Sequence, residues 1–275
     1  MAHVSIIFFW IAFLLYGGAF ALFIYYLLTR RPAMNSLGLA LVAAGLACHT
    51  AAVLLRGLDA GRVPAVGAYE SLSLAAWSIV VVYLVLELFT RIKAIGLYVM
   101  PVVLVLLTLA LVGYKAPAGL MPALRSDIVV LHVIVMFSAI GCLYVAGGAA
   151  IIYLIEEALL RRRRAGGVLG RLPSLGALEK LVYHATLLGL PFLTMGMLAG
   201  VIRAEAFVVP HWWVDPMVLL SLGAWAVYVV LLWGRIRADW VGSRIAWLAV
   251  TGLVVLFVIR FAAVPYLSGF HTYGG

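Results

Sequence analysis

The sequence predicts an all-α membrane protein, a polytopic bundle of about eight transmembrane helices. Composition, the length of the apolar runs and the placement of basic residues carry this prediction. Hydrophobic residues make up 67% of the 275 residues and charged residues 11%, and the mean hydropathy is +1.19. A water-soluble protein of this size could not bury so large a fraction of hydrophobic residues in its core. The apolar residues also come in long runs, and a helix needs roughly 20 of them to cross a bilayer.

Each apolar run between charged, proline or glycine breaks is an expected span. In chain order the eight spans cover residues 4–29, 36–56, 67–90, 95–113, 128–156, 179–201, 216–234 and 245–266. The first is too long for the core of a signal peptide and is followed by Arg30 and Arg31, so we expect it to be retained. Ser126-Asp127 and Asp215-Pro216 predict N-caps for the fifth and seventh spans. No soluble domain fits in the remaining residues, so we expect one integral membrane domain over residues 1–275.

Basic residues set the expected orientation. Eight spans place both termini on one side, and thirteen Lys and Arg residues fall in alternate loops against four in the opposite loops. The larger set is Arg30, Arg31, Arg91, Lys93, Arg161, Arg162, Arg163, Arg164, Arg171, Lys180, Arg235, Arg237 and Arg244, and the smaller is Arg56, Arg62, Lys115 and Arg125. The basic loops are therefore expected in the cytoplasm and both termini outside. This bias explains the net charge of +9 without a nucleic-acid partner, and the run of residues 161–164 is interpreted as a topology anchor beside anionic lipid.

Polar chemistry collects in the loops predicted to face outward. His132 lies about one turn inside the outer end of the fifth span, and His211 and His271 lie in outer loops. Imidazole suits iron, copper or zinc, but no HExxH motif or carboxylate cluster points to a hydrolytic zinc site. Haem iron needs two axial ligands and a flat apolar wall, which His132, His271 and the pair Trp212-Trp213 would supply. Tryptophans are also common interfacial anchors and Asp-Pro a common helix cap, so the residues alone leave both interpretations open.

Five segments of the chain follow one another in the order and spacing of a known family. They are Arg56…Gly61…Pro64…Tyr69-Glu70-Ser71-Leu72…Trp77-Ser78; Pro122-Ala123-Leu124-x-Ser126…His132-Val133…Met136; Gly189…Leu193-Thr194-x-Gly196…Gly200; Trp212…Asp215-Pro216…Trp225; and Gly269-x-His271-x-Tyr273-Gly274. In these residues the chain resembles the CcsA-like (ResC-type) cytochrome c assembly family of System II, which includes the HemX-like membrane proteins. Each segment alone is a weak match, and the five in order are a strong one.

The resemblance implies a haem-binding membrane protein that handles haem b and presents it on the outer face for covalent attachment to apocytochrome c. It implies that His132 and His271 are the axial ligands of the iron. It also places Trp212, Asp215 and Trp225 in the haem platform, beside Trp213 of the apolar wall. The resemblance further implies a bacterial cytoplasmic (inner) membrane, a haem site on its periplasmic face and a ResB-type membrane subunit as partner. The chain shows no nucleophile or proton relay, so it would at most be the haem-delivery part of a partner-dependent holocytochrome c synthase.

Three more residues are candidates for haem binding. His49, inside the second span, resembles the family's membrane-embedded histidine. A hydrogen bond to a neighbouring carbonyl is the alternative, because a histidine at this depth needs a partner. Arg203 and Arg260 lie near the outer ends of the sixth and eighth spans, where the family is normally uncharged. We expect one or both to hold haem propionates, or else to pair with Glu205 or Asp215.

The Trp-rich loop departs from the family pattern. The family usually reads Trp-x-Trp-Asp-Pro-Lys-Glu, whereas this chain reads Trp212-Trp213-Val214-Asp215-Pro216-Met217-Val218 and lacks one aromatic residue and both charges. The loss leaves open a HemX-like regulatory membrane protein of haem biosynthesis without ligation activity. A small-molecule transporter is a third possibility, although no convincing internal repeat supports the inverted-repeat kind.

Overall fold

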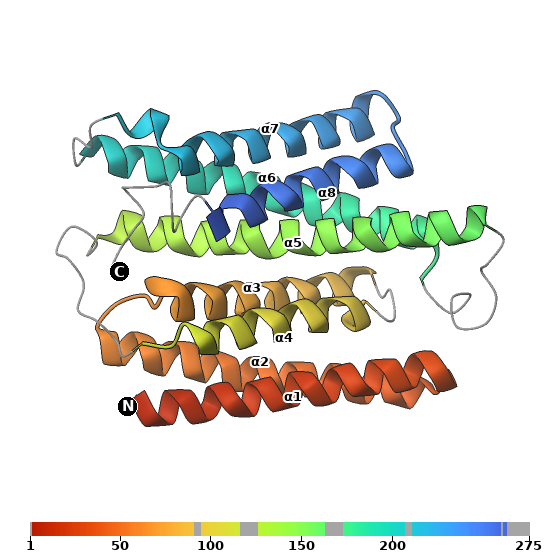
Figure 1. Cartoon of the computed structure of the whole chain (residues 1–275), viewed down its shortest axis with the longest axis horizontal. Coiled ribbons are helices and arrows are strands. Elements are labelled where there is room, and N and C mark those ends of the chain that lie inside the picture. Colours follow the sequence, from red (N-terminus) through yellow and green to blue (C-terminus); the bar gives the residue numbers. More distant parts are fainter. Residues whose placement is uncertain are drawn as a thin grey trace. The chain divides into compact units, whose positions relative to one another are not determined.

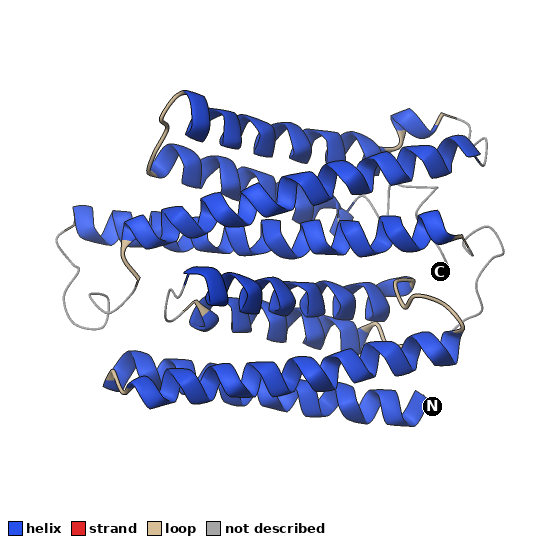
Figure 2. Cartoon of the chain, turned by 180° about the vertical axis from the view of Figure 1, so that it is seen from behind, coloured by secondary structure: helices blue, strands red, loops and turns tan. Residues whose placement is uncertain are grey.

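The computed structural model describes residues 2–90, 95–115, 126–162, 173–206, 211–259 and 261–262. Within these ranges every regular element is a helix (Figures 1 and 2). The helices are α1 (Ala2–Thr29), α2 (Pro32–Ala60), α3 (Gly67–Thr90), α4 (Gly96–Val112), α5 (Asp127–Arg161), α6 (Leu175–Ala206), α7 (Pro216–Arg237) and α8 (Ser243–Val258), with a 3-10 turn η3 (Trp212–Val214) before α7. These α-helices match the eight predicted spans one to one, so the prediction of an all-α helical bundle is confirmed.

Length and composition make the chain a multi-pass membrane protein. Six of the described helices, namely α1, α2, α3, α5, α6 and α7, are long and apolar enough to cross a bilayer. The apolar helices α4 and α8 are shorter, with 17 and 16 described residues. Helix α5 continues to Arg161, beyond the predicted end at residue 156, because its last turns carry charged residues that a search for apolar runs excludes. The part of the eighth predicted span after residue 262 lies outside the described residues.

Local capping chemistry explains where several helices begin and end. The Ser126 hydroxyl accepts a hydrogen bond from the Val129 amide at 3.4 Å at the start of α5. The Asp215 carboxylate accepts one from the Met217 amide at 2.8 Å, and Pro216 occupies the first position of α7. Both predicted N-caps are confirmed. Helix α2 ends at Ala60 and is capped by Gly61, whose φ of 63° lies in the left-handed region that glycine enters without strain.

The chain divides into two compact units. Unit 1 comprises residues 1–125 and 159–174, and unit 2 comprises residues 126–158 and 175–275. In unit 1, α1 and α2 run antiparallel side by side (Figure 1), with Gly45 of α2 against the ring of Tyr16 and Gly38 against Phe23. Helix α4 packs on α1 at Gly96, again against Phe23. Small residues let helix backbones approach closely, as is usual between helices in a membrane.

Unit 2 packs by the same means. Along α6, Gly189 faces Leu143 of α5, Gly196 faces Met136 and Gly200 faces His132. In these three pairs the residue number on α5 falls by as much as the residue number on α6 rises, as expected for two antiparallel helices. Helix α8 contacts α5 where Gly147 meets Leu253 and α7 where Gly252 meets Tyr228. The expectation of a single domain over residues 1–275 stays a prediction.

Candidate functional site

His132 is held on α5 by a main-chain group of α6. Its Nδ1 lies 2.7 Å from the carbonyl oxygen of Gly196. A carbonyl oxygen only accepts hydrogen bonds, so Nδ1 carries the proton and donates it, and the lone pair of the ring is left on Nε2. The ring lies over Gly200, where a Cβ atom would come within 3.0 Å of its Cε1. The half-buried imidazole is therefore fixed in both tautomer and position.

Two predicted tryptophans are anchored on the same helix. The indole N–H of Trp225 on α7 donates to Thr194 Oγ1 at 2.9 Å. The indole N–H of Trp212 in η3 donates to Glu205 Oε1 at 2.8 Å. With the bond from His132 to Gly196, side chains from α5, η3 and α7 thus converge on one stretch of α6, residues 194–205. Helix α6 is the common support of the candidate site.

The aromatic loop before α7 presents two indoles at a steep angle. The rings of Trp212 and Trp213 lie 5.9 Å apart, edge to face at 81°. Trp213 is 54% exposed, which leaves a broad apolar surface for a ligand or for lipid. His211 is also exposed and lies edge-on to Trp213 at 5.4 Å. The described role of Asp215 is the cap of α7; its part in a haem platform stays a prediction.

Of the two arginines predicted to bind haem propionates, the structure describes only Arg203. Arg203 lies in the last turn of α6, in the same segment as Glu205. One oxygen of Glu205 binds Trp212, so this carboxylate serves the aromatic loop. Arg260 and the predicted second axial ligand, His271, lie outside the described residues. Their roles therefore stay predictions.

His49 is fully buried in unit 1, with both ring nitrogens in contact with hydroxyl groups. Its Nδ1 lies 3.4 Å from Tyr16 Oη and its Nε2 lies 3.0 Å from Ser73 Oγ. The partners are side chains, whereas the sequence suggested a main-chain carbonyl as the alternative to haem. Binding of iron by His49 would require one of these two contacts to be replaced.

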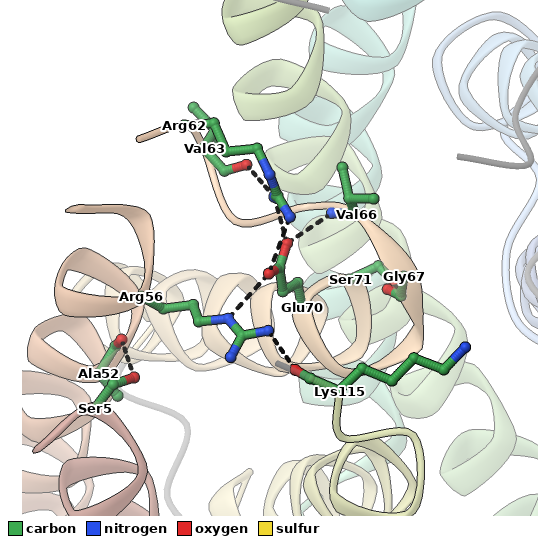
Figure 3. Close-up of polar contacts among 10 residues, drawn as sticks. All are labelled: Ser5, Ala52, Arg56, Arg62, Val63, Val66, Gly67, Glu70, Ser71 and Lys115. Carbon is green, nitrogen blue, oxygen red and sulfur yellow. Dashed lines mark hydrogen bonds and ion pairs between the residues drawn. The ribbon is translucent and has the colours of Figure 1, made fainter. Parts of the chain in front are cut away.

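A buried ionic cluster at one end of unit 1 was not predicted as a site. Glu70 of α3 accepts hydrogen bonds from Arg56 Nε at 2.9 Å, from both Nη atoms of Arg62 and from the Val66 amide at 3.0 Å (Figure 3). Arg56 also donates to the carbonyl oxygen of Lys115 at 2.7 Å. The side chains of Arg56 and Glu70 are only 6% and 2% exposed. The sequence feature that could have predicted this cluster is one carboxylate and two guanidinium groups beside apolar runs, because buried charges require partners.

Comparison with known proteins gives the family. The model of a family described as cytochrome C assembly protein matches residues 65–271. The chain belongs to the cytochrome c assembly protein family. The matched range contains every predicted site residue except His49, which precedes it. Membership of the family, first suggested by five segments of the sequence, is confirmed.

Similar proteins of this family match most of the length of the chain. The chain is 28% identical over 291 residues to the cytochrome c biogenesis protein CcsA of Microcystis aeruginosa, covering 88% of this chain and 89% of that protein. It is 29% identical over 251 residues to CcsA of Guillardia theta, covering 83% of each chain. It is 27% identical over 299 residues to CcsA of Gloeobacter violaceus, covering 89% of this chain and 88% of that protein. The similarity extends over most of the membrane bundle.

Proposed function

We propose that this chain is a haem-binding membrane protein of cytochrome c biogenesis, which holds haem b and presents it to apocytochrome c. Membership of the cytochrome c assembly family and the names of the CcsA relatives support the process. The same names favour assembly over the HemX-like regulatory alternative. Haem is here the cargo and substrate of the protein.

The hydrogen bond from His132 to Gly196 is the observation that carries the haem proposal. Histidines that bind metals usually donate their other ring N–H to a carbonyl or carboxylate, which sets the tautomer and makes the ligating nitrogen more basic. His132 has this arrangement at 2.7 Å, with Nε2 as the remaining nitrogen. The Nε2 atom of His132 therefore fits one axial position of haem iron. The anchored indoles of Trp212 and Trp225 fit an aromatic wall for the porphyrin. His271 is proposed for the other axial position from the resemblance of the sequence.

A second histidine makes the same kind of bond and provides an internal control. His184 Nδ1 contacts the carbonyl oxygen of Lys180 at 2.7 Å. This carbonyl belongs to the preceding turn of the same helix, and the His184 side chain is exposed. It lies at the opposite end of α6 from Gly200 and Glu205. His184 thus has the tautomer of a ligand without the support of the aromatic loop.

The chemistry assigned to the protein is binding and orientation. Thioether formation adds cysteine thiols of the apocytochrome across the vinyl groups of haem. The contribution of this chain would be to hold the porphyrin so that the vinyl edge meets the thiols, which lowers the entropic barrier to their reaction. Arg203 and Arg260 would bind the propionates, since guanidinium groups hold carboxylates in a bidentate manner. A ResB-type subunit, a bacterial cytoplasmic membrane and a haem site on its outer face complete the proposal.

The test is single substitution of each histidine, followed by measurement of haem content and the visible spectrum of the purified protein. Two imidazoles on opposite faces of a porphyrin give six-coordinate, low-spin iron. We expect His132→Ala and His271→Ala to lose haem or the low-spin spectrum and to regain that spectrum with added imidazole. His184→Ala and His211→Ala should match the wild type. Retention of wild-type haem and spectrum in both of the first two variants would refute the ligand assignment. Arg203→Gln and Arg260→Gln variants that retain haem would refute the assignment of the propionates.

A further inference from the structure

Each of the two units contains a hydrogen bond from a side chain of its first helix to a main-chain carbonyl of its second helix, at an equivalent position. In unit 1, Ser5 of α1 donates from Oγ to the carbonyl oxygen of Ala52 on α2 at 2.9 Å. In unit 2, His132 of α5 donates from Nδ1 to the carbonyl oxygen of Gly196 on α6 at 2.7 Å. Each bond joins a side chain near the start of the unit's first helix to the main chain of its second helix. The shift in residue number is 127 for the first helices and 144 for the second.

A second contact obeys the same two shifts. Gly45 of α2 faces Tyr16 of α1, and Gly189 of α6 faces Leu143 of α5. Tyr16 and Leu143 again differ by 127 in number, and Gly45 and Gly189 by 144. Because the two contacts lie several turns apart along the helices, their agreement fixes one common register for α1 with α2 and for α5 with α6.

The third helices also correspond. The indole N–H of Trp77 on α3 donates to Thr50 on α2 at 2.9 Å, and that of Trp225 on α7 donates to Thr194 on α6 at 2.9 Å. The threonines differ by 144 and the tryptophans by 148. At this shift Leu72-Ser73-Leu74-Ala75-Ala76-Trp77 aligns with Leu220-Ser221-Leu222-Gly223-Ala224-Trp225, identical at five of six positions. The sequence alone showed no convincing repeat, and the contacts supply the evidence that it lacked. The shift changes from helix to helix because the loops differ in length, so no fixed period exists.

We propose that the chain is a tandem repeat of one four-helix module, and that Gly200 positions the ligand histidine of the second copy by replacing an arginine of the first. A copy with four spans returns the chain to its starting side, so the repeat is not of the inverted kind. The role of the histidine rests on the proposed function in haem binding. The correspondence of the units rests on the shared contacts and on the matching residues around Trp77 and Trp225, not on haem binding.

The exchange between the copies is reciprocal in volume, and it removes the charge of the arginine. At the shift of 144, Arg56 of unit 1 corresponds to Gly200 of unit 2, and Ser5 corresponds to His132 at the shift of 127. A small donor and a large neighbour in unit 1 thus become a large donor and the smallest neighbour in unit 2. An arginine at position 200 would collide with the imidazole, since even a Cβ atom would lie 3.0 Å from its Cε1.

The carboxylate follows the arginine. Glu70, the partner of Arg56, corresponds at the shift of 148 to Val218. A buried carboxylate without its guanidinium partner is strongly unfavourable, so the loss of one charge requires the loss of the other. Beside the ionic cluster in unit 1 lies a cavity of about 10 Å³, lined in part by Ala52, Arg56, Glu70 and Ser73. The corresponding positions in unit 2 are Gly196, Gly200, Val218 and Ser221, none of which carries a charge.

The experiment restores the residues of the first copy in the second. The variants are Gly200→Arg, Gly200→Arg with Val218→Glu, and both of these with His132→Ser. Two readouts are needed: the melting temperature of the haem-free protein in detergent, and haem content with the visible spectrum. Gly200→Arg should lower the melting temperature and abolish haem binding. The triple variant should reverse at least half of the decrease in melting temperature caused by Gly200→Arg, and it should not bind haem. Its new ion pair and the smaller side chain at position 132 reproduce the surroundings of Arg56.

Matched variants separate charge pairing from volume and protect the test against misfolding. Val218→Ala in place of Val218→Glu should give no recovery. Gly200→Ala should keep the fold yet lower haem retention. Gly223→Ala should leave haem retention unchanged, because no atom of the described residues, apart from the local helix backbone, lies within 4 Å of the new Cβ. If the melting temperature of the triple variant does not recover, the proposed repeat is overturned. Unchanged haem binding in Gly200→Ala overturns the positioning role of Gly200. A wild-type protein without haem would refute the proposed function alone, because the recovery is measured without haem.

Discussion

Removal of the Glu70 carboxylate should be among the most destabilising single changes in unit 1. The carboxylate compensates two arginines in a setting where its own side chain is 2% exposed and those of Arg56 and Arg62 are 6% exposed. Breaking a buried ion pair by removing one partner costs roughly 3–5 kcal/mol, because the remaining charge stays desolvated. We therefore expect Glu70→Ala to lower the free energy of unfolding by about that amount. Glu70→Gln should recover only a minor part, since it restores shape and one acceptor without charge.

An ion pair of unit 2 provides the matched control. Arg235 Nη1 lies 3.1 Å from Glu179 Oε1, with side chains 31% and 17% exposed. Both side chains are half-buried, so water screens this pair more than the Glu70 cluster, and Glu179→Ala should cost less than Glu70→Ala. The assay is reversible unfolding of the detergent-solubilised protein, followed by circular dichroism at low and high salt. High salt should weaken the effect of Glu179→Ala and leave that of Glu70→Ala nearly unchanged. Equal losses for the two variants would refute the view that the Glu70 cluster is held by desolvated charges.

Three further predictions concern the caps, the aromatic anchors and the membrane topology. Asp215→Ala should lower the free energy of unfolding by about 1 kcal/mol through loss of the α7 cap, whereas Asp215→Asn, which can still accept from the amide, should cost little. Thr194→Val should leave the indole N–H of Trp225 without its acceptor and cost roughly 1–3 kcal/mol, visible as a shift in tryptophan fluorescence, and Thr194→Ser should restore both values. Reporter fusions should place the loop of residues 161–164 in the cytoplasm; an external reporter signal would contradict the proposed orientation.

A separate prediction addresses the buried histidine of unit 1. His49→Leu should destabilise the protein, because the hydroxyl groups of Tyr16 and Ser73 lose their shared partner inside the helix bundle. Its haem content should match the wild type if the ring serves these two hydroxyl groups only. A haem content lowered as far as in His132→Ala would assign His49 to a second haem instead.

The sequence by itself determined the features that depend on short stretches of chain. Apolar runs predicted all eight helices, because the thickness of the bilayer imposes a minimum length on each. Ser126 and Asp215 were identified as caps because an N-cap bonds to an amide two or three residues further on. His132 and the Trp-rich loop were found through ordered motifs, and the range matched by the family model contains them.

Only the tertiary structure decided which side chains meet across helices. The bond from His132 to Gly196 joins residues 64 positions apart, and the partners of His49 come from two other helices. Such contacts depend on the rotation and register of whole helices, which the apolar pattern of a membrane helix does not specify because nearly all of its faces are apolar. The repeat was hidden for a related reason. Loops change length without disturbing packed helices, so the two copies keep their contacts while the sequence loses any common period.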